Sequence, residues 1–331
     1  MGNADPVAVG ENTHPGEFNY LDDHAESSLF RNGKVLTRRD EDGSDAEYVG
    51  VNLKPCTLEV HNARKLSGAT RKTCEVNGFE LLDAPLEKVS LDFLDHQQVV
   101  GSYYSECEQL VAEATGAQAF AFDHNIRSAA GKKSTQRISG GQTVQGPAKI
   151  VHGDYTLYSG PQRLKDLAKP PNVNDTLRAV LPKDTSLISS AMVEESLTGG
   201  GRFAIINVWR NIVEEPVQTN PMAMCDGQTV EPEDLVTFEI HYADRIGENY
   251  FAKHHPRHQF FYYPEMTRDE PMLLKQWDSE GGLAHSGGAE SDASSPGRPC
   301  TFSFHSAFDD ILAPDDAPDR WSIEVRCIVI Y

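Results

Sequence analysis

A polar cluster directly after an apolar pair marks residues 150–154, Ile-Val-His-Gly-Asp, as candidates for chemistry. In an extended strand, residues two apart point to the same side, so His152 and Asp154 would present an imidazole and a carboxylate together. Gly153 leaves space between them. Two histidines and one carboxylate on one face of an octahedral Fe(II) leave three positions open, enough for a bidentate cosubstrate and dioxygen. His152 and Asp154 are therefore candidates for two of the three ligands.

The His-x-acid pattern is weak evidence by itself. With 12 histidines and 50 acidic residues among 331, about two matches are expected by chance, and two occur. The other match, His24-Ala25-Glu26, lies in an N-terminal segment that we expect to carry no chemistry. A metal site of this kind also needs a second histidine from a neighbouring strand.

Residues 301–308, TFSFHSAF, offer that histidine. Strand alternation would place His305 on the face opposite Phe302 and Phe304, away from the aromatic packing side, and that orientation suits a ligand. A lone strand histidine is more often a hydrogen-bonded structural residue. The alternation leaves both interpretations of His305 open.

The last strand contains RWSIEVR at 320–326, in which a charged face alternates with an apolar one. A diacid that chelates a metal leaves its far carboxylate some distance away, where an arginine fork with a hydroxyl beside it is a natural partner. Arg320 lies fifteen residues after His305 (320 minus 305), a plausible hairpin distance. The charged face could instead be a solvated sheet edge. Nevertheless, it is much less probable that chance would produce all three features in this order than any one of them: a His-x-Asp pair, a later strand histidine and an Arg-x-Ser pair.

A series of short motifs along the chain resembles a known family. The motifs are HGDYT, SGPQR, RFAIINVWR, YYPEMTRDE, WDS, FHSAFDD and R-x-SIEVR. This series is similar to the hydroxylase/desaturase group that includes fungal gibberellin desaturase, the AsaB-type enzymes and the cephamycin methoxylation component CmcJ. The similarity runs from about Asp123 to Tyr331. Asn211 and Trp321 depart from the pattern, but neither is a proposed ligand.

The resemblance implies a site and its cofactors. Members of the group are regarded as Fe(II)- and 2-oxoglutarate-dependent oxygenases of natural-product pathways, built on a double-stranded β-helix. Transferred to this sequence, the iron ligands would be His152, Asp154 and His305. Arg320 and Ser322 would hold the far carboxylate of 2-oxoglutarate, with Arg326 as the competing arginine.

The reaction implied is oxygenation with Fe(II), 2-oxoglutarate and O2, at an unactivated C–H bond of a small natural-product intermediate. Hydroxylation, desaturation and oxidative cyclisation all begin with the same hydrogen abstraction, and the sequence does not distinguish them. One alternative is a cupin-like metal-dependent hydrolase or isomerase that uses the same ligands without a cosubstrate. Another is a non-catalytic partner subunit, since CmcJ is one component of a two-protein activity.

Three residues of the strand RFAIINVWR are candidates for contact with the substrate. Asn207 and Trp209 share a strand face and could line the pocket, although Asn207 could equally satisfy a buried backbone group. Arg210 points to the opposite face. It could bind an acidic substrate, but a structural ion pair is the more common role.

Two other histidine-containing stretches are less favourable as metal sites. In HHPRH at 254–258, Pro256 breaks strand alternation, and we predict a solvated turn. Asp123 and His124 are adjacent, so in a strand they would point to opposite faces. We predict a structural or substrate-related role for this pair.

Composition limits the partners. A formal net charge of −20 disfavours nucleic acid, and no apolar run approaches the roughly 18 residues that spanning a membrane requires. The N-terminus lacks a basic start followed by an apolar run, so we expect a cytoplasmic protein. Its six cysteines lack C-x-x-C spacing and are predicted to be free thiols. A homo-oligomer is permitted but not indicated.

The expected fold is mainly β with flanking helices, an α+β chain around a double-stranded β-helix of the jelly-roll or cupin-like kind. Residues 1–50 are predicted to be a flexible or surface-wrapping segment and 51–331 a single domain. Gly116 would end a helix over 101–116, and Asp184 or Thr185 would cap a second helix that ends at Gly199. Short β-branched and aromatic runs after about residue 202 predict antiparallel strands. The Gly/Ser-rich stretch 280–299 is predicted to be a mobile loop.

Overall fold

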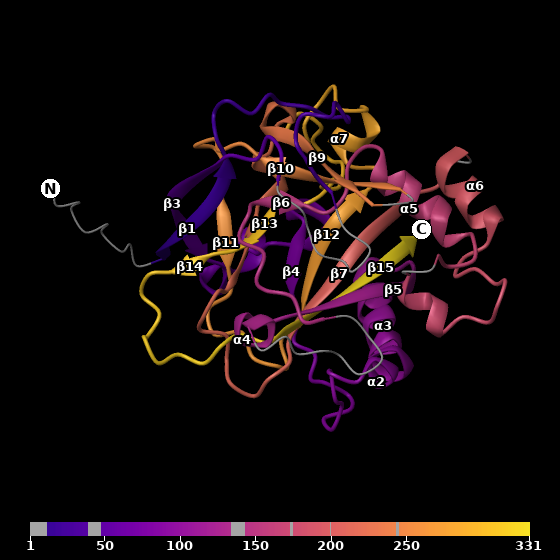
Figure 1. Ribbon diagram of the computed structural model, residues 1–331, viewed down its shortest axis with the longest axis horizontal. Helices are drawn as coiled ribbons and strands as arrows, with labels where there is room; N and C mark the ends of the chain where they lie inside the picture. Colours follow the sequence, from indigo (N-terminus) through magenta and orange to yellow (C-terminus); the bar gives the residue numbers. More distant parts are fainter. Residues whose placement is uncertain (1–11, 39–47, 134–142, 173–174, 199, 243–244) are drawn as a thin grey trace, which may run out of the picture.

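Two β-sheets with flanking helices make up the architecture, so the expected mainly β, α+β class is confirmed (Figure 1). The computed structural model describes residues 12–38, 48–133, 143–172, 175–198, 200–242 and 245–331. All six cysteines are free thiols, and only Cys56 is not buried. Within the described residues, no helix is long and apolar enough to cross a membrane.

The larger sheet has ten strands in the order β14-β1-β3-β11-β8-β13-β6-β10-β9-β2. In chain order they are β1 (Thr13–Leu21), β2 (Leu36–Arg38), β3 (Leu53–Asn62), β6 (His152–Gly153), β8 (Met222–Cys225), β9 (Leu235–His241), β10 (Ile246–Ala252), β11 (Phe260–Tyr262), β13 (His305–Ala307) and β14 (Asp309–Asp310).

The smaller sheet has the order β4-β12-β7-β15-β5, with β15 paired antiparallel to both of its neighbours. Its strands are β4 (Phe79–Leu81), β5 (Gln118–Arg127), β7 (Phe203–Asn211), β12 (Met272–Asp278) and β15 (Ser322–Ile330). The apolar runs that predicted strands in the second half of the chain correspond to β7, β9, β10, β11, β12, β13 and β15.

The α-helices are α1 (Cys74–Asn77), α2 (His96–Gln98), α3 (Tyr104–Thr115), α4 (Ala129–Lys133), α5 (Ser159–Leu167), α6 (Ser190–Thr198) and α7 (Gly282–His285), and a π-helical turn, η3 (Val99–Tyr103), precedes α3. Short 3-10 turns are η1 (Ala63–Lys65), η2 (Gly68–Thr70), η4 (Thr176–Ala179), η5 (Gly227–Thr229) and η6 (Pro232–Asp234). The helix expected over 101–116 is confirmed as α3, and Gly116 ends it with a φ of 69°.

The smaller sheet has one apolar and one polar face in its centre. Val208 pairs with Val325, and both belong to the core cluster that includes Cys107 and Val111 of α3. Strand alternation turns the neighbouring residues to the other face, where Asn207 pairs with Arg326. This polar face, rather than the helix-covered one, is available to a site between the sheets.

The N-terminal segment corrects one prediction. In its described part, β1 pairs over nine residues with β3, and Phe18, Tyr20 and Leu21 are fully buried. Of the two alternatives for residues 1–50, a flexible or a surface-wrapping segment, the flexible one is therefore wrong for β1. Figure 1 shows β1 and β3 in indigo, on the side of the molecule away from α5 and α6.

The second predicted helix begins later than expected. Neither Asp184 nor Thr185 caps it: α6 starts at Ser190, and the Ser189 hydroxyl oxygen accepts a hydrogen bond from the Met192 amide at 3.2 Å. Asp184 instead has a φ of 64°, a left-handed conformation incompatible with a helix start. Gly199 lies outside the described residues.

Residues 280–299 differ from an open loop. They contain α7, and the buried Asp292 carboxylate accepts hydrogen bonds from the Leu283 amide and from both the amide and hydroxyl of Thr301. These contacts tie the two ends of the segment to each other. A Gly/Ser-rich composition therefore did not reveal that Asp292 anchors this stretch.

Replacing Phe18 with alanine should lower the free energy of unfolding by about 3–5 kcal/mol, because a fully buried aromatic ring would leave a cavity in the core. Urea unfolding followed by fluorescence measures this. The control is Val89→Ala, at a residue that is 74% exposed, which should change stability by less than about 0.5 kcal/mol. Equal midpoints for the two variants would show that β1 is dispensable.

Candidate metal centre

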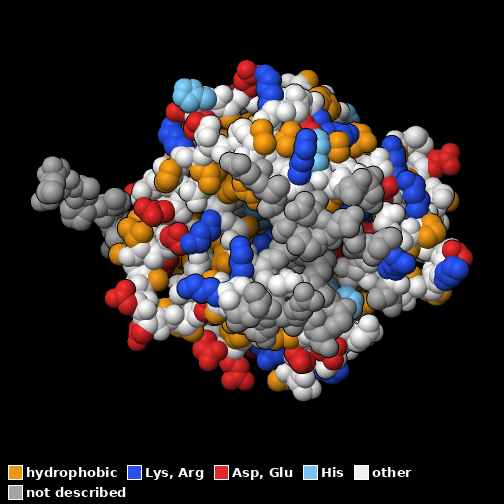
Figure 2. All heavy atoms as spheres, in the orientation of Figure 1, with side chains coloured by type: hydrophobic (Ala, Val, Ile, Leu, Met, Phe, Trp, Pro, Cys, Tyr) orange, Lys and Arg blue, Asp and Glu red, His pale blue; other side chains and the backbone are white. Residues whose placement is uncertain are grey.

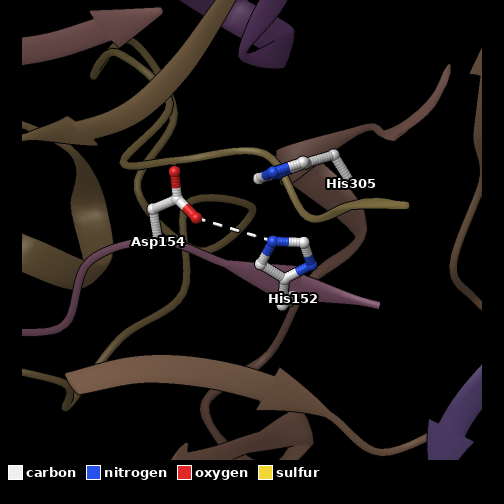
Figure 3. Close-up of side chains that lie close together, drawn as sticks. All are labelled: His152, Asp154 and His305. Atoms are coloured by element: carbon white, nitrogen blue, oxygen red, sulfur yellow. Dashed lines mark ion pairs between the residues drawn. The ribbon is translucent and has the colours of Figure 1, made fainter. Parts of the chain in front are cut away.

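His152 and His305 lie next to each other on paired strands. β6 and β13 are antiparallel neighbours, and His305 is directly opposite His152, with ring centroids 4.3 Å apart. Asp154 follows β6 immediately, and Figure 3 shows its carboxylate turned toward the two imidazoles. One potential ligand atom from each residue lies within 4.8 Å of the others. This is the only such group of three among the described residues.

The hydrogen bonds of the two histidines leave one nitrogen of each ring for a metal. The Nδ1 of His152 donates to the carbonyl of Ile150 at 2.7 Å, and the Nδ1 of His305 points to the carbonyl of Ser303 at 3.4 Å. Since a carbonyl can only accept, each Nδ1 carries the proton and each Nε2 keeps its lone pair. The Nε2 of His152 is 3.5 Å from Oδ1 of Asp154, while the buried Oδ2 of Asp154 has no hydrogen-bond partner.

The protonation states also suit metal binding. Burial lowers the pKa of His305 to about 3, and the neighbouring His152 adds to the shift, so the His305 ring is neutral at neutral pH. Burial alone would raise the pKa of Asp154, but the adjacent His152 and the charge of Arg326 outweigh burial and hold that pKa well below its usual range. A neutral imidazole and an ionised carboxylate are the forms that coordinate a cation.

Gly153 allows the strand to fit. A Cβ at this position would lie 3.0 Å from the ring of Phe302, a contact so tight that the ring would have to move. Phe302 and Phe304 are buried in an aromatic cluster on the side away from the imidazoles, as alternation in TFSFHSAF predicted. The glycine therefore lets β6 approach this cluster while its neighbours face the site.

The polar face of the smaller sheet bears several buried groups without partners. Neither side-chain atom of Asn207 has a hydrogen-bond partner, and the same holds for Nε1 of Trp209 and Nε2 of Gln276. The other end of the Gln276 amide accepts a hydrogen bond from the backbone amide of Asp154 at 3.3 Å. Gln276 thus connects this face to the three candidate ligands. In Figure 2, Lys and Arg side chains border a hollow near the centre of the viewed face.

Arg320 is a buried cation with spare donors. Its guanidinium donates through Nη1 to the carbonyl of Asn220, whereas Nε and Nη2 have no partner. It lies 5.7 Å from the ring centroid of Trp209. Burial lowers the pKa of Arg320 to about 9, and the charge of Arg127 adds to this shift, so the group remains cationic at neutral pH. The buried Ser322 is two residues further along, at the start of β15.

Arg326, the competing arginine, is already paired. Its guanidinium lies 3.1 Å from Asp123, 3.2 Å from Glu324 and 3.8 Å from Oδ2 of Asp154. Arg326 therefore neutralises carboxylates around the candidate ligands, whereas Arg320 keeps N–H groups that no described residue accepts from.

Arg210 is not brought to this cluster. It lies on the opposite face of β7, where it donates to Glu106 at 2.8 Å and to the hydroxyl of Tyr103 at 2.9 Å. Its side chain is completely buried. The structural ion pair considered for Arg210 is present, and nothing in this environment is open to a substrate.

The two less favourable histidine stretches behave largely as predicted. Asp123 and His124 point to opposite faces: Asp123 pairs with Arg326, and His124 bonds to the hydroxyl of Tyr104 at 2.8 Å. In 254–258 a turn is present, but His258 is not solvated. Its ring is buried and lies 3.0 Å from Asp234, because the turn folds back onto that carboxylate.

Two residues of the site were missed from the sequence. Arg127 ends the polar alternation Asp123, Asn125, Arg127 along β5, a period-2 signal that was available. Gln276 follows Lys275 at a bulge of β12, where the alternation is interrupted. The neighbouring strands of these residues could not be predicted, because β5 pairs with β15 near the far end of the chain.

Comparison with known proteins agrees with this geometry. A family model described as an oxidoreductase/YMDC permease-like domain matches residues 18–330. The chain belongs to this family. Its sequence is 44% identical over 207 residues to an uncharacterised protein in the dcmA 3' region of Methylophilus leisingeri, covering 62% of this chain and 94% of that protein.

Several relatives carry the names of dioxygenases or other oxidoreductases. The Fe(II)/2-oxoglutarate-dependent dioxygenase nvfI of Aspergillus novofumigatus is 29% identical over 288 residues, 84% of each chain. The hydroxylase/desaturase efuI of Hormonema carpetanum is 25% identical over 345 residues, 98% of this chain and 97% of the relative. The solved structure of the iron and alpha-ketoglutarate-dependent endoperoxidase NvfI has the same fold, with a TM-score of 0.70 and 22% identity. The match covers 97% of this chain and 99% of that one.

The predicted resemblance is thereby confirmed. The chain is an oxidoreductase of the Fe(II)/2-oxoglutarate-dependent dioxygenase group, and its class implies a small-molecule substrate. The names of the relatives imply Fe(II) and 2-oxoglutarate as cofactor and cosubstrate.

Replacing Arg210 with alanine should lower the free energy of unfolding by about 3–5 kcal/mol, because Glu106 would be left as a buried charge without its partner. Urea unfolding measures the loss, and an iron titration of the folded variant should give the wild-type affinity. The control is Arg64→Ala, which removes a more exposed pair with Glu270 and should cost at most about 1 kcal/mol. A weakened iron affinity in the Arg210 variant would contradict a purely structural role.

Proposed function

We propose that this chain is a non-haem Fe(II)/2-oxoglutarate-dependent oxygenase with a double-stranded β-helix core, in which His152, Asp154 and His305 hold the iron. One observation carries the proposal: three converging ligand atoms are joined through Gln276 to the face of the smaller sheet on which Arg320, a buried arginine with two unpartnered nitrogens, lies against Trp209. The ligands come from the larger sheet, and the arginine precedes β15 of the smaller one. Two facing sheets with this division of roles support the double-stranded β-helix assignment.

The donor set fits iron(II). Two imidazoles with free Nε2 atoms and one carboxylate form a facial set that leaves positions open for other ligands. The carbonyls of Ile150 and Ser303 fix the ring orientations through the opposite nitrogens. The unpartnered Oδ2 of Asp154 is a buried acceptor that a cation would satisfy.

Arg320 and Ser322 would hold the far carboxylate of 2-oxoglutarate. A carboxylate accepts parallel hydrogen bonds from an arginine fork, and the free Nε and Nη2 of Arg320 supply such donors. Arg326 is a weaker candidate because Asp123 and Glu324 already engage it. Its role would be to keep Asp154 ionised and correctly oriented.

Bound iron would supply the oxidising chemistry, in which O2 and 2-oxoglutarate are consumed and hydrogen is removed from an unactivated C–H bond. The residues of this chain provide position and environment. Gln276 holds the backbone amide of Asp154, the aromatic cluster around Phe302 excludes water behind the ligands, and Arg320 fixes the cosubstrate's direction. A rigid, dry site of this kind favours reaction at one carbon of a bound substrate.

The substrate would be a small, oxygen-bearing natural-product intermediate. Asn207, Trp209 and Gln276 present a buried acceptor and several buried donors without partners, which a substrate with both kinds of polar group could satisfy. Relatives named as hydroxylase/desaturase and endoperoxidase show that related chains support different outcomes. Hydroxylation, desaturation and oxidative cyclisation all remain compatible with these residues.

The two other candidate functions explain fewer of these contacts. A cupin-like hydrolase or isomerase would use the same metal ligands, but the unpartnered nitrogens of Arg320 would then lack a purpose. A non-catalytic partner subunit has no physical need for two imidazoles and a carboxylate that converge in a buried place.

Asp154→Ala should weaken Fe(II) affinity by at least about 100-fold, because it removes the one anionic ligand. Anaerobic calorimetry of the purified protein measures the change. Glu26→Ala is the matched control: it belongs to the other His-x-acid motif, is exposed, and pairs with Lys34 rather than with a histidine. Unchanged affinity in the Asp154 variant would reject this ligand set.

Anaerobic addition of Fe(II) and 2-oxoglutarate to the wild type should produce the weak visible charge-transfer band of a chelated keto acid. In Arg320→Ala the apparent affinity for 2-oxoglutarate should fall about 10- to 100-fold, since a charge-assisted, bidentate contact is lost.

A wild-type protein that binds iron tightly but shows no band would overturn the oxygenase assignment and favour the metal-dependent hydrolase or isomerase. A band whose 2-oxoglutarate dependence is unaltered in Arg320→Ala would instead assign the far carboxylate to another residue.

A further inference from the structure

Arg127 is a second arginine on the polar face of the smaller sheet. It is the last residue of β5 and stands directly opposite Ser322 of β15. Arg320 precedes Ser322 by two residues, so Arg127 and Arg320 are diagonal neighbours, a separation that long side chains bridge. Arg127 also interacts electrostatically with Asp154 and His305, which places it near the candidate metal ligands.

Neither arginine has a carboxylate partner among the described residues. The guanidinium of Arg127 donates through Nη1 to the carbonyl of Gly146 at 3.0 Å, and that of Arg320 donates to the carbonyl of Asn220. The remaining nitrogens of these two side chains make no hydrogen bond to a described residue. The direct hydrogen bonds of both cations to described residues therefore go to carbonyl oxygens, and the described carboxylates act on them only from beyond ion-pair distance.

The nearby carboxylates are engaged elsewhere. Glu324 pairs with Arg326 at 3.2 Å, and Asp319 accepts hydrogen bonds from the Ser128 hydroxyl and the Ala130 amide. The fully buried Arg210 has such a partner in Glu106, and the half-buried Arg326 has Asp123 and Glu324. Two neighbouring cations with no described carboxylate at ion-pair distance form an unusual arrangement inside a protein.

The missing counter-charge has a natural source in the cosubstrate. A carboxylate has two oxygens and about four acceptor sites, so it can receive hydrogen bonds from two guanidinium groups and a hydroxyl at once. Ser322 is the strand partner of Arg127 and lies two residues after Arg320. The strand pairing thus brings the two arginines and the serine to the same end of β15.

We propose that Arg127 shares with Arg320 the binding of the far carboxylate of 2-oxoglutarate, and so acts as a second determinant of cosubstrate specificity. The proposal rests on the oxygenase function proposed above. It assigns Arg127 to the cosubstrate and not to an acidic substrate, because its cross-strand partner is the serine beside Arg320 and not Asn207 or Trp209.

The test compares two keto acids that differ only at the far end. Wild type and Arg127→Gln are loaded anaerobically with Fe(II) and titrated with 2-oxoglutarate or 2-oxopentanoate, which lacks the far carboxylate. The charge-transfer band gives each affinity without turnover. Arg127→Gln should bind 2-oxoglutarate about 10- to 100-fold more weakly and 2-oxopentanoate within about twofold of wild type.

Two variants make the comparison specific. Arg64→Gln removes an arginine far along the surface that pairs with Glu270, and should leave both affinities unchanged. Arg127→Lys keeps the charge but loses the planar fork, so its 2-oxoglutarate affinity should lie between those of wild type and Arg127→Gln. It also serves as the test if Arg127→Gln does not fold.

Thermal unfolding supplies an independent measurement. Without ligands, Arg127→Gln should melt at or above the wild-type temperature, because it removes one of two neighbouring like charges. Addition of Zn(II) and 2-oxoglutarate should then stabilise the variant less than the wild type.

Three results would overturn the proposal. Equal weakening of both keto acids would mean that Arg127 acts through the metal ligands. Unchanged affinity for both would assign it to the substrate. A wild type that binds iron but neither keto acid would instead reject the oxygenase function itself, and with it this role for Arg127.

Discussion

The pairing of β6 with β13 is the contact on which the rest of the site depends. These strands share a single residue pair, His152 with His305, and the outer neighbours β10 and β8 hold it in register. A shift of one residue would turn an imidazole to the opposite face, because side chains alternate along a strand. The N-terminal strand contributes as well: the carbonyl of Asn19 accepts the amide of Val151 at 2.9 Å. Ligand geometry is therefore fixed by contacts between distant parts of the chain.

Charge is distributed unevenly around these ligands. Arg326 lies among three carboxylates, those of Asp123, Glu324 and Asp154, and this arrangement neutralises one side of the site. On the other side, Arg320 has no carboxylate partner among the residues described. An unpaired buried cation destabilises the empty protein and strengthens the binding of an anion that reaches it. If Arg320 binds the cosubstrate as proposed, the same imbalance lowers the stability of the empty protein and raises its affinity for a diacid.

The convergence of His152, Asp154 and His305 could be predicted from the sequence, and the scaffold around them only in part. Period-2 alternation correctly predicted that the side chains of His152, Asp154 and His305 point to one side, because side-chain direction in a strand is a local property. It failed for the N-terminal strand, where Pro15 and Gly16 interrupt the apolar pattern before Phe18. The helix start at Ser190 depends on one side-chain hydrogen bond from the chain segment before it, and the anchor at Asp292 depends on three hydrogen bonds to Leu283 and Thr301. Arg127 could not be placed because its strand partner lies near the other end of the chain.

The two sides of the site also differ in how far their residues can be substituted without loss of the fold. Backbone pairing of β6 with β13 positions the candidate ligands, so a substitution in these strands alters either the candidate metal site or the sheet. On the facing side, Asn207, Trp209 and Gln276 are single side chains whose polar atoms have no protein partner. A substrate that lacks the matching group would leave these atoms buried and unpaired, which makes hydrogen-bond selection far sharper than selection by an apolar wall. Replacing one of them changes which substrate fits and leaves the strand intact. A common fold at 22% identity to an endoperoxidase is therefore compatible with a different substrate and outcome in this chain.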